Sequence, residues 1–311
     1  MKKDAFVASK FKTKKPYSER KATFLVLLIT LLAIAFFWSE ANITNLWQKL
    51  KTPASFEIFY QKNKNKDEIL GEIKNLTKDL MGSYSVYVYS FGAGREYGID
   101  EDKVFIAASL NKIPIMLKAY QMIEEEKLSL NDKYELKKED IQDYGTGSMR
   151  YEEIGKEYTY NQLLVLTGKE SDNTAAHVLG KIIGLEEVQS LLGELGLEKI
   201  SMEKNETTPR QLGQLFIKAW KGEVLKKEEI KKRFFDNLTR TDFEDRISLG
   251  IPSGVRIAHK VGSADRTYHD CGLVFGQNNF VLCIFSSEAS EEEALGVMPK
   301  IAKVVWEFEE N

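Results

Sequence analysis

The sequence predicts an α/β (α+β) protein in which an antiparallel sheet is built from the two ends of a globular region. A helical lobe is inserted between those ends, and an N-terminal transmembrane helix precedes the whole region. Alternating strand patterns occur at both ends of the globular region, and helical patterns dominate its middle. Such segregation is typical of folds with helices beside an antiparallel sheet. An uncharged apolar run near the N-terminus is the third observation.

That apolar run predicts a membrane helix. Residues 22–38 read ATFLVLLITLLAIAFFW, which is at the short end of what crosses a bilayer core. Residues 1–21 form a basic tail, so the positive-inside rule keeps the N-terminus cytoplasmic. We expect a single-pass anchor in the cell membrane and an extracytoplasmic main domain. A signal peptide cleaved near Ser39-Glu40-Ala41 is the alternative, and it places the rest of the chain on the same side.

A polar juxtamembrane linker over residues 39–66 leads into the globular region, residues 67–311. Helical patterns predict a helical middle at 109–232. Period-two alternation predicts strands on both sides of it, at 83–90, 95–99, 255–261, 271–275 and 280–286. Apolar residues at helical spacing predict a first helix over 67–81 and a last helix over 291–307.

The composition narrows the possible partners. With 43% hydrophobic residues, 29% charged residues and a formal net charge of −3, the chain gives no reason to expect nucleic acid. No Cys/His spacing resembles a zinc site, and no cofactor is expected. Cys271 and Cys283 flank a predicted hairpin. We expect two buried free thiols there, with a cross-strand disulfide as the alternative.

Ser109 and Lys112 lie at the start of a predicted helix, directly after an apolar run. On a helix, residues i and i+3 share a face, so the Lys112 amine is expected beside the Ser109 hydroxyl. A neutral lysine accepts a proton from serine, and backbone N–H groups at a helix N-terminus stabilise an oxyanion. The same spacing recurs at Ser9, Ser18 and Ser201, so this pattern alone does not identify a nucleophile.

Two further patterns follow along the chain. Ser171-Asp-Asn173 lies between two amphipathic helices, where its residue types also suit a plain helix N-cap. Lys260-Val-Gly-Ser263 ends a predicted strand. A lysine on an edge strand often only protects against aggregation, but the glycine and serine after it favour a backbone that a ligand approaches closely.

Together, and in this order, the three patterns resemble the S-x-x-K, S-D-N and K-T-G set of the class A serine β-lactamase and penicillin-binding protein (D,D-peptidase-like) family. Thr207-Thr208-Pro209 resembles the start of the helix after the family's omega loop, and Tyr268–Gly272 resembles the opening of the next strand. The resemblance covers residues 67–311. It implies a β-lactamase/transpeptidase-like fold with a five-stranded antiparallel sheet, flanking helices and an all-helical lobe.

The resemblance also implies a catalytic role for each of four residues. Ser109 would attack the carbonyl of a β-lactam or a D-alanyl peptide and become acylated, with Lys112 as its base. Ser171 would relay a proton to the leaving nitrogen. Lys260 would assist that transfer and attract the substrate carboxylate.

Substrate would be bound by Asn173, Gly262 and Ser263. Asn173 would contact the substrate amide or Lys112, and the backbone N–H groups of Ser109 and Ser263 would form the oxyanion hole. The expected partners are therefore a small-molecule β-lactam or a peptidoglycan stem peptide, together with the membrane through residues 22–38.

Two departures from the family bear on activity. Val261 stands where the family usually has Thr or Ser, and the missing hydrogen bond to a carboxylate costs roughly 1.5–3 kcal/mol. The family's lactamases carry Glu-x-x-Leu-Asn in the omega loop, and its glutamate activates the deacylating water. That pattern does not occur here, and the nearest acids, Glu203 and Glu206, are interpreted as solvated loop carboxylates. We therefore expect acylation followed by slow deacylation.

Two other functions use the same residues. A catalytically weak penicillin- or peptidoglycan-binding sensor domain is favoured by Val261. An esterase or amidase acting on an unrelated substrate is the third hypothesis, and a panel of simple esters would separate it from peptide hydrolysis.

Overall fold

The computed structural model describes Leu28 and residues 65–310. The predicted tail, the predicted linker apart from residues 65–66, and the predicted anchor apart from Leu28 lie outside the described residues. The first helix begins at Lys66, within the end of the predicted linker. Within the described part, no helix has the length and apolar character needed to cross a membrane. The chain divides into the units Met1–Tyr60 and Gln61–Asn311, and every element below belongs to the second.

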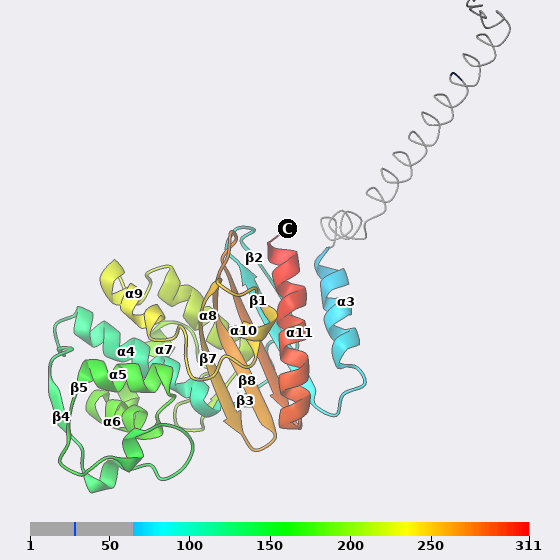
Figure 1. Cartoon of the computed structure of the whole chain (residues 1–311). Coiled ribbons are helices and arrows are strands. Elements are labelled where there is room, and N and C mark those ends of the chain that lie inside the picture. The colour runs from blue at the N-terminus through cyan, green and yellow to red at the C-terminus, as the bar shows by residue number, and fades with distance from the viewer. Residues whose placement is uncertain (1–27, 29–64, 311) are drawn as a thin grey trace, which may run out of the picture. The chain divides into compact units, whose positions relative to one another are not determined.

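The described region contains helices, short 3-10 helices and strands (Figure 1). The α-helices are α3 (Lys66–Thr77), α4 (Lys112–Glu124), α5 (Tyr160–Lys169), α6 (Asn173–Ile183), α7 (Leu185–Glu194), α8 (Pro209–Trp220), α9 (Glu228–Asp236), α10 (Ile247–Gly250) and α11 (Glu291–Glu309). The 3-10 helices are η1 (Ala108–Asn111), η2 (Lys138–Asp140) and η3 (Met149–Tyr151). The strands are β1 (Ser83–Ser90), β2 (Arg95–Ile99), β3 (Phe105–Ile106), β4 (Lys133–Glu135), β5 (Glu157–Thr159), β6 (Glu206–Thr207), β7 (Arg256–Ala264), β8 (Thr267–Phe275) and β9 (Phe280–Ser287).

The main sheet is antiparallel and has the order β2-β1-β9-β8-β7. Strand β9, from the end of the chain, pairs with β1 over its whole length, from Ser83 opposite Ser287 to Ser90 opposite Phe280. The prediction of a five-stranded sheet built from both ends is therefore confirmed. Strand β7, predicted to end at Val261, continues to Ala264 and forms one edge of the sheet.

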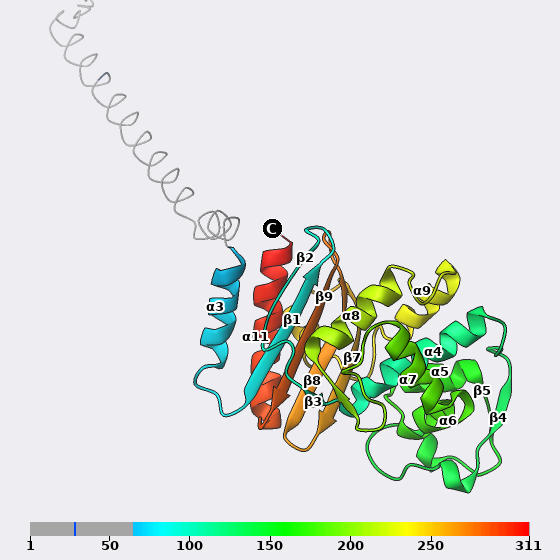
Figure 2. The ribbon, with the colours of Figure 1, turned by 180° about the vertical axis from the view of Figure 1, so that it is seen from behind.

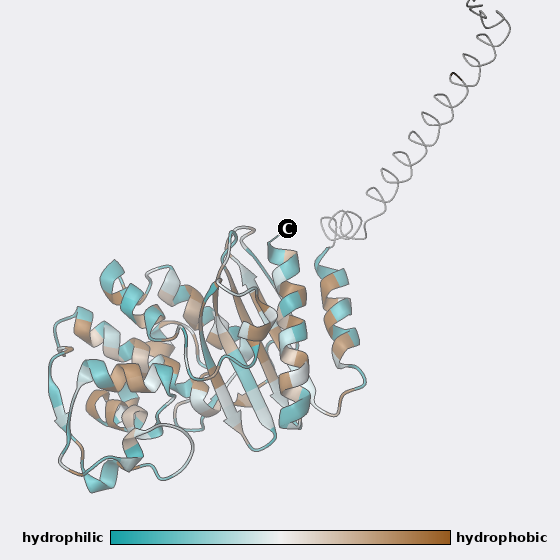
Figure 3. Ribbon diagram, viewed as in Figure 1, coloured by the Kyte–Doolittle hydropathy of each residue, from teal (hydrophilic) through white to brown (hydrophobic). Residues whose placement is uncertain are grey.

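Both faces of the sheet are buried. On β1, Val86 and Val88 belong to the core shared with α3 and α11, whereas Tyr87 belongs to the core shared with α8 and the helical lobe. Figures 1 and 2 show α3 and α11 on one face and α8 on the other. In Figure 3, hydrophilic and hydrophobic turns alternate along α3 and α11, as expected for helices with one buried side.

Helix α8 packs very closely on the sheet because Gly213 has no side chain. A Cβ at this position would lie 2.5 Å from a ring carbon of Tyr87 and 3.3 Å from Sγ of Cys283. This contact fixes α8, whose first turn follows β6, against the centre of the sheet.

A short pairing between a segment just before the helical region and one within it was not predicted. Strand β3 pairs with β6, so that Phe105 lies opposite Thr207 and Ile106 opposite Glu206. Strands of two residues are too short to show periodicity. The pairing matters for function because β3 leads directly into η1.

The cysteine expectation was wrong. Cys271 on β8 and Cys283 on β9 lie directly opposite each other and form a disulfide, with Cα atoms 3.9 Å apart. The register of the hairpin decides this, since facing residues on antiparallel strands are close enough to be bridged.

Candidate functional site

Ser109 lies in η1, one turn before α4, on a backbone that is held from two sides. Ala108, directly before it, has a φ of +49°, a conformation that costs a residue other than glycine about 1–3 kcal/mol. The Ala107 amide donates to the Asn205 carbonyl at 2.6 Å, next to the β3–β6 pairing. This support positions the Ser109 hydroxyl at the N-terminal end of α4.

Lys112, the first residue of α4, reaches both serines of the predicted site. Its Nζ lies 3.0 Å from Ser109 Oγ and 3.2 Å from Ser171 Oγ. It also donates to the Ser171 carbonyl at 2.5 Å and to Asn173 Oδ1 at 2.6 Å. Four residues predicted as site residues from two separate patterns are thus in direct contact.

The Lys112 amine is almost fully buried, at 4% exposure. Burial lowers its pKa from 10.5 to about 7, and the charge of Asp172 only partly opposes the change. Near neutral pH a large share of this lysine is therefore a free amine, as a general base must be.

Asp172, the middle residue of the Ser171-Asp-Asn173 pattern, is the N-cap of α6. Its carboxylate accepts from the Ala175 amide at 2.8 Å and from the Met149 amide at 2.7 Å. The plain N-cap interpretation thus holds for Asp172. The residues on either side of it remain available to face Lys112.

A loop before η3 fixes these two flanking residues. Thr146 Oγ1 donates to the Ser171 carbonyl at 2.8 Å, and Asn173 Nδ2 donates to the Tyr144 carbonyl at 2.9 Å. Ser171 has a φ of +54°, and these two hydrogen bonds stabilise that conformation. No sequence pattern had pointed to this loop.

Strand β7 brings Lys260, Gly262 and Ser263 to the same place. A Cβ on Gly262 would lie 2.8 Å from the Ala107 carbonyl oxygen and 3.1 Å from Cγ of Leu110, so glycine is required for β7 to approach η1. Lys260 is 2% exposed. Burial, followed by the charge of Lys112, holds the pKa of Lys260 well below its ordinary value.

Arg246 is a site residue that the sequence had not indicated. Its guanidinium donates to Ser263 Oγ at 2.7 Å, to the His269 carbonyl at 2.5 Å and to the Gly262 carbonyl at 3.2 Å. It lies in a loop 14 positions before Lys260, with no motif around it. Only the fold brings it beside β7, where its guanidinium adds a positive charge to the site.

The segment between α7 and α8 contacts η1 through the side chain of Asn205. Asn111 Nδ2 donates to Asn205 Oδ1 at 3.0 Å. The side chains of Glu203 and Glu206 make no hydrogen bond or ion pair with described residues, and Glu203 is exposed. For Glu203 this agrees with the interpretation as a solvated loop carboxylate, whereas Glu206 is half-buried on strand β6. Within the described ranges, no group of three or more His, Cys, Asp or Glu side chains is placed to hold a metal ion.

Comparisons with known proteins place the chain in a family. The model of the beta-lactamase enzyme family matches residues 69–308. Beta-lactamase VEB-1 of Pseudomonas aeruginosa is 25% identical over 285 residues, which cover 81% of this chain and 94% of that protein. Beta-lactamase SME-1 of Serratia marcescens is 22% identical over 249 residues, covering 73% and 83%.

Solved structures share the fold. PBP-A superposes with a TM-score of 0.72 at 22% identity, covering 78% of this chain and 96% of that one. A PBP-A variant solved as an acyl-enzyme complex with penicillin G has the same TM-score. The TLA-1 extended spectrum beta-lactamase gives a TM-score of 0.74 at 22% identity, covering 80% and 100%. Since the family model spans most of the chain and the fold agrees, this protein belongs to the beta-lactamase enzyme family, among the class A serine β-lactamases and their penicillin-binding relatives.

Proposed function

We propose that this protein is a serine hydrolase that forms an acyl-enzyme on Ser109 with β-lactams or D-alanyl peptides and releases the acyl group slowly. The observation that carries the proposal is the position of the Lys112 amine. Its two shortest hydrogen bonds go to the Ser171 carbonyl and Asn173 Oδ1, and Ser109 Oγ lies 3.0 Å away. When the amine is neutral, its two N–H groups serve those acceptors and its lone pair faces the Ser109 hydroxyl.

The acylation step follows from these contacts. The Ser109 oxygen attacks the carbonyl carbon while its proton moves to Lys112 Nζ. Ser171 Oγ, 3.2 Å from that nitrogen, passes a proton to the leaving amide nitrogen. The C–N bond breaks, an ester to Ser109 forms, and Lys112 becomes neutral again.

Anion binding completes the site. The oxyanion is assigned to the backbone N–H groups of Ser109 and Ser263, which Gly262 allows to approach each other. The substrate carboxylate is assigned to Lys260, Arg246 and the Ser263 hydroxyl. Arg246 thereby replaces the donor that Val261 lacks.

Deacylation lacks its usual base. In this family a glutamate of the omega loop activates the water that cleaves the ester. Here the residue of that segment held against η1 is Asn205, whose amide cannot take a proton from water. The ester is therefore expected to persist, which favours a penicillin-binding peptidase or a poor β-lactamase.

We also propose that residues 22–38 anchor the protein in the cell membrane, with residues 39–311 outside the cytoplasm. The supporting observations are the uncharged apolar run and the basic tail before it. Added protease should degrade the outer region in intact spheroplasts, and a protected outer region would refute this orientation.

The test of the acyl-enzyme uses the full chain in detergent. Intact mass is followed against time after benzylpenicillin is added, with Ser109→Ala as the control. A persistent adduct of one penicillin that is absent in the variant supports the proposal. Absence of an adduct on the wild-type chain, while bulk antibiotic stays intact, would favour the binding-domain alternative, and an adduct that clears rapidly would contradict slow deacylation.

A further inference from the structure

A buried network of charged side chains lies behind the carboxylate-binding end of the site. His259, on β7, is fully buried, and its Nδ1 lies 2.8 Å from Asp270 Oδ1 on β8. On the other side of the ring, Nε2 lies 3.3 Å from Glu244 Oε1 and 3.3 Å from Ser248 Oγ. The Ser248 hydroxyl in turn donates to Glu244 Oε2 at 2.6 Å. None of these residues takes part in the acylation steps described above.

The network continues into the segment that carries Arg246. Asp270 Oδ2 accepts from the Ile247 amide at 3.0 Å, directly after Arg246 in the chain. Asp270 thus uses one oxygen for His259 and the other for the backbone next to the guanidinium. Ser248, one residue further along α10, is held by Glu244 and His259. The start of α10 is therefore attached to β7 and β8 through this network as well as through the hydrogen bonds of Arg246 itself.

The two carboxylates of the network face a positive charge only while His259 is protonated. Burial by itself would lower the pKa of His259, but the carboxylates of Asp270 and Glu244 outweigh it and raise the pKa to about 9. Burial would likewise raise the pKa of Glu244, yet His259, Ser248 and the Thr241 amide lower it to about 2. At neutral pH one imidazolium therefore lies between two carboxylates.

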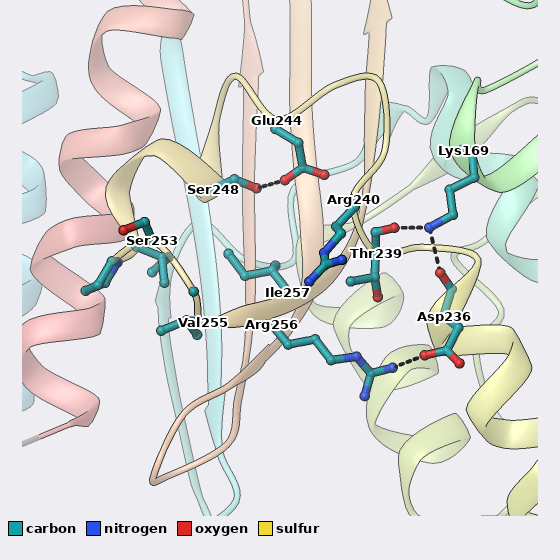
Figure 4. A pocket seen from close by; sticks show the side chains of 13 residues that line it. Lys169, Asp236, Thr239, Arg240, Glu244, Ser248, Ser253, Val255, Arg256 and Ile257 are labelled. Atoms are coloured by element: carbon teal, nitrogen blue, oxygen red, sulfur yellow. Dashed lines mark hydrogen bonds and ion pairs between the residues drawn. The ribbon is translucent and has the colours of Figure 1, made fainter.

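The outer end of the network meets solvent. Glu244 and Ser248 line a hollow of about 610 Å³ beside β7 (Figure 4). The Glu244 side chain is 40% exposed there, whereas the His259 side chain behind it has no exposed surface. A proton can thus be exchanged between solvent and His259 at this end, away from the Ser109 side of β7.

We propose that His259, clamped between Asp270 and Glu244, is a positioning residue that holds Arg246 against β7 and thereby sets the preference for substrates that carry a carboxylate. Neither His259 nor Glu244 touches the substrate. Their effect passes through Asp270 and the Ile247 amide to the guanidinium. The inference rests on the proposed function, in which Arg246 binds the substrate carboxylate.

The test compares benzylpenicillin with its methyl ester, which lacks the free carboxylate. Acylation rate constants are measured for the wild-type chain, His259→Gln, Glu244→Gln and Arg246→Ala, with the exposed helical His177→Gln as a matched control. We expect the acid-to-ester rate ratio to fall on the order of tenfold in the first two variants, with the ester rate nearly unchanged. Arg246→Ala should show the same loss, and adding His259→Gln to it should cause no further loss.

The proposal would be overturned if His259→Gln lowered the acylation rate equally for both compounds. It would also be overturned if the losses in acylation rate of Arg246→Ala and His259→Gln were additive in the double variant. Either result would mean that His259 acts only on stability. The ratio should also fall in the wild-type chain as the pH rises through about 9, while His259→Gln shows no such step. The charged groups facing His259 among the described residues are Asp270 and Glu244, and Glu244 remains ionised throughout that range.

A crystal structure of His259→Gln separates this inference from the proposed function. We expect the Arg246 guanidinium to leave Ser263 Oγ and the His269 carbonyl. If it stays there, the positioning role is refuted whatever the enzyme does. If the wild-type chain is acylated by neither compound, the proposed function fails, while the guanidinium position still decides the structural inference.

Discussion

The pKa of Lys112 determines how acylation should depend on pH. The drop from 10.5 to about 7 is worth about 5 kcal/mol, at about 1.4 kcal/mol for each tenfold change in the equilibrium. Between pH 6 and pH 8 the neutral fraction of this amine should rise about tenfold and then level off. We expect the single-turnover acylation rate with a chromogenic cephalosporin to follow this curve. A rate that rises tenfold per pH unit through pH 9 would show that Lys112 keeps an ordinary pKa.

The lowered pKa of Lys112 should also affect the free energy of unfolding. Between about pH 7 and pH 10.5 the unfolded chain binds a proton at Lys112 that the folded chain does not, so this residue makes stability rise with pH. Lys112→Met removes the titration and the general base together. Relative to this variant, the wild-type chain should gain about 3 kcal/mol of unfolding free energy between pH 6 and pH 9. Urea titrations at both pH values measure it, and an unchanged difference would refute the burial argument.

Two further predictions concern the framework of the site. Gly262→Ala places a Cβ 2.8 Å from the Ala107 carbonyl oxygen, so acylation should slow by on the order of a hundredfold while the chain still folds. Gly71→Ala, where a Cβ meets nothing within 4 Å, is the control and should leave acylation unchanged. Reducing the disulfide, or replacing Cys271 and Cys283 by alanine, should lower the unfolding free energy by about 2–3 kcal/mol. Equal urea midpoints with and without reductant would indicate free thiols.

The candidate catalytic residues could be proposed from the sequence because each pattern is local. Lys112 lies three positions after Ser109 on one helical turn, so their contact follows from helix geometry alone. The Ser171-Asp-Asn173 and Lys260-Val-Gly-Ser263 patterns were recognisable because their order along the chain matches the family. The five main strands were predictable for a similar reason, since period-two alternation is a property of consecutive residues.

Other features depend on which segments the fold brings together. Arg246 reaches Ser263 only because the loop before α10 packs along the edge strand β7. The β3–β6 pairing and the Asn205 contact with Asn111 join segments about a hundred residues apart, and neither has a periodic signal of its own. Their positions are set by the closure of the sheet and the packing of α8.

The amino-acid sequence by itself therefore determined the sheet and the contact between Ser109 and Lys112, because local spacing and alternation encode them. Only the tertiary structure decided that the cysteines are joined, because the register of β8 against β9 places them face to face. It also decided the pKa of Lys112 and the Asp270–His259–Glu244 network, because burial and charge proximity arise only when distant segments pack against one another.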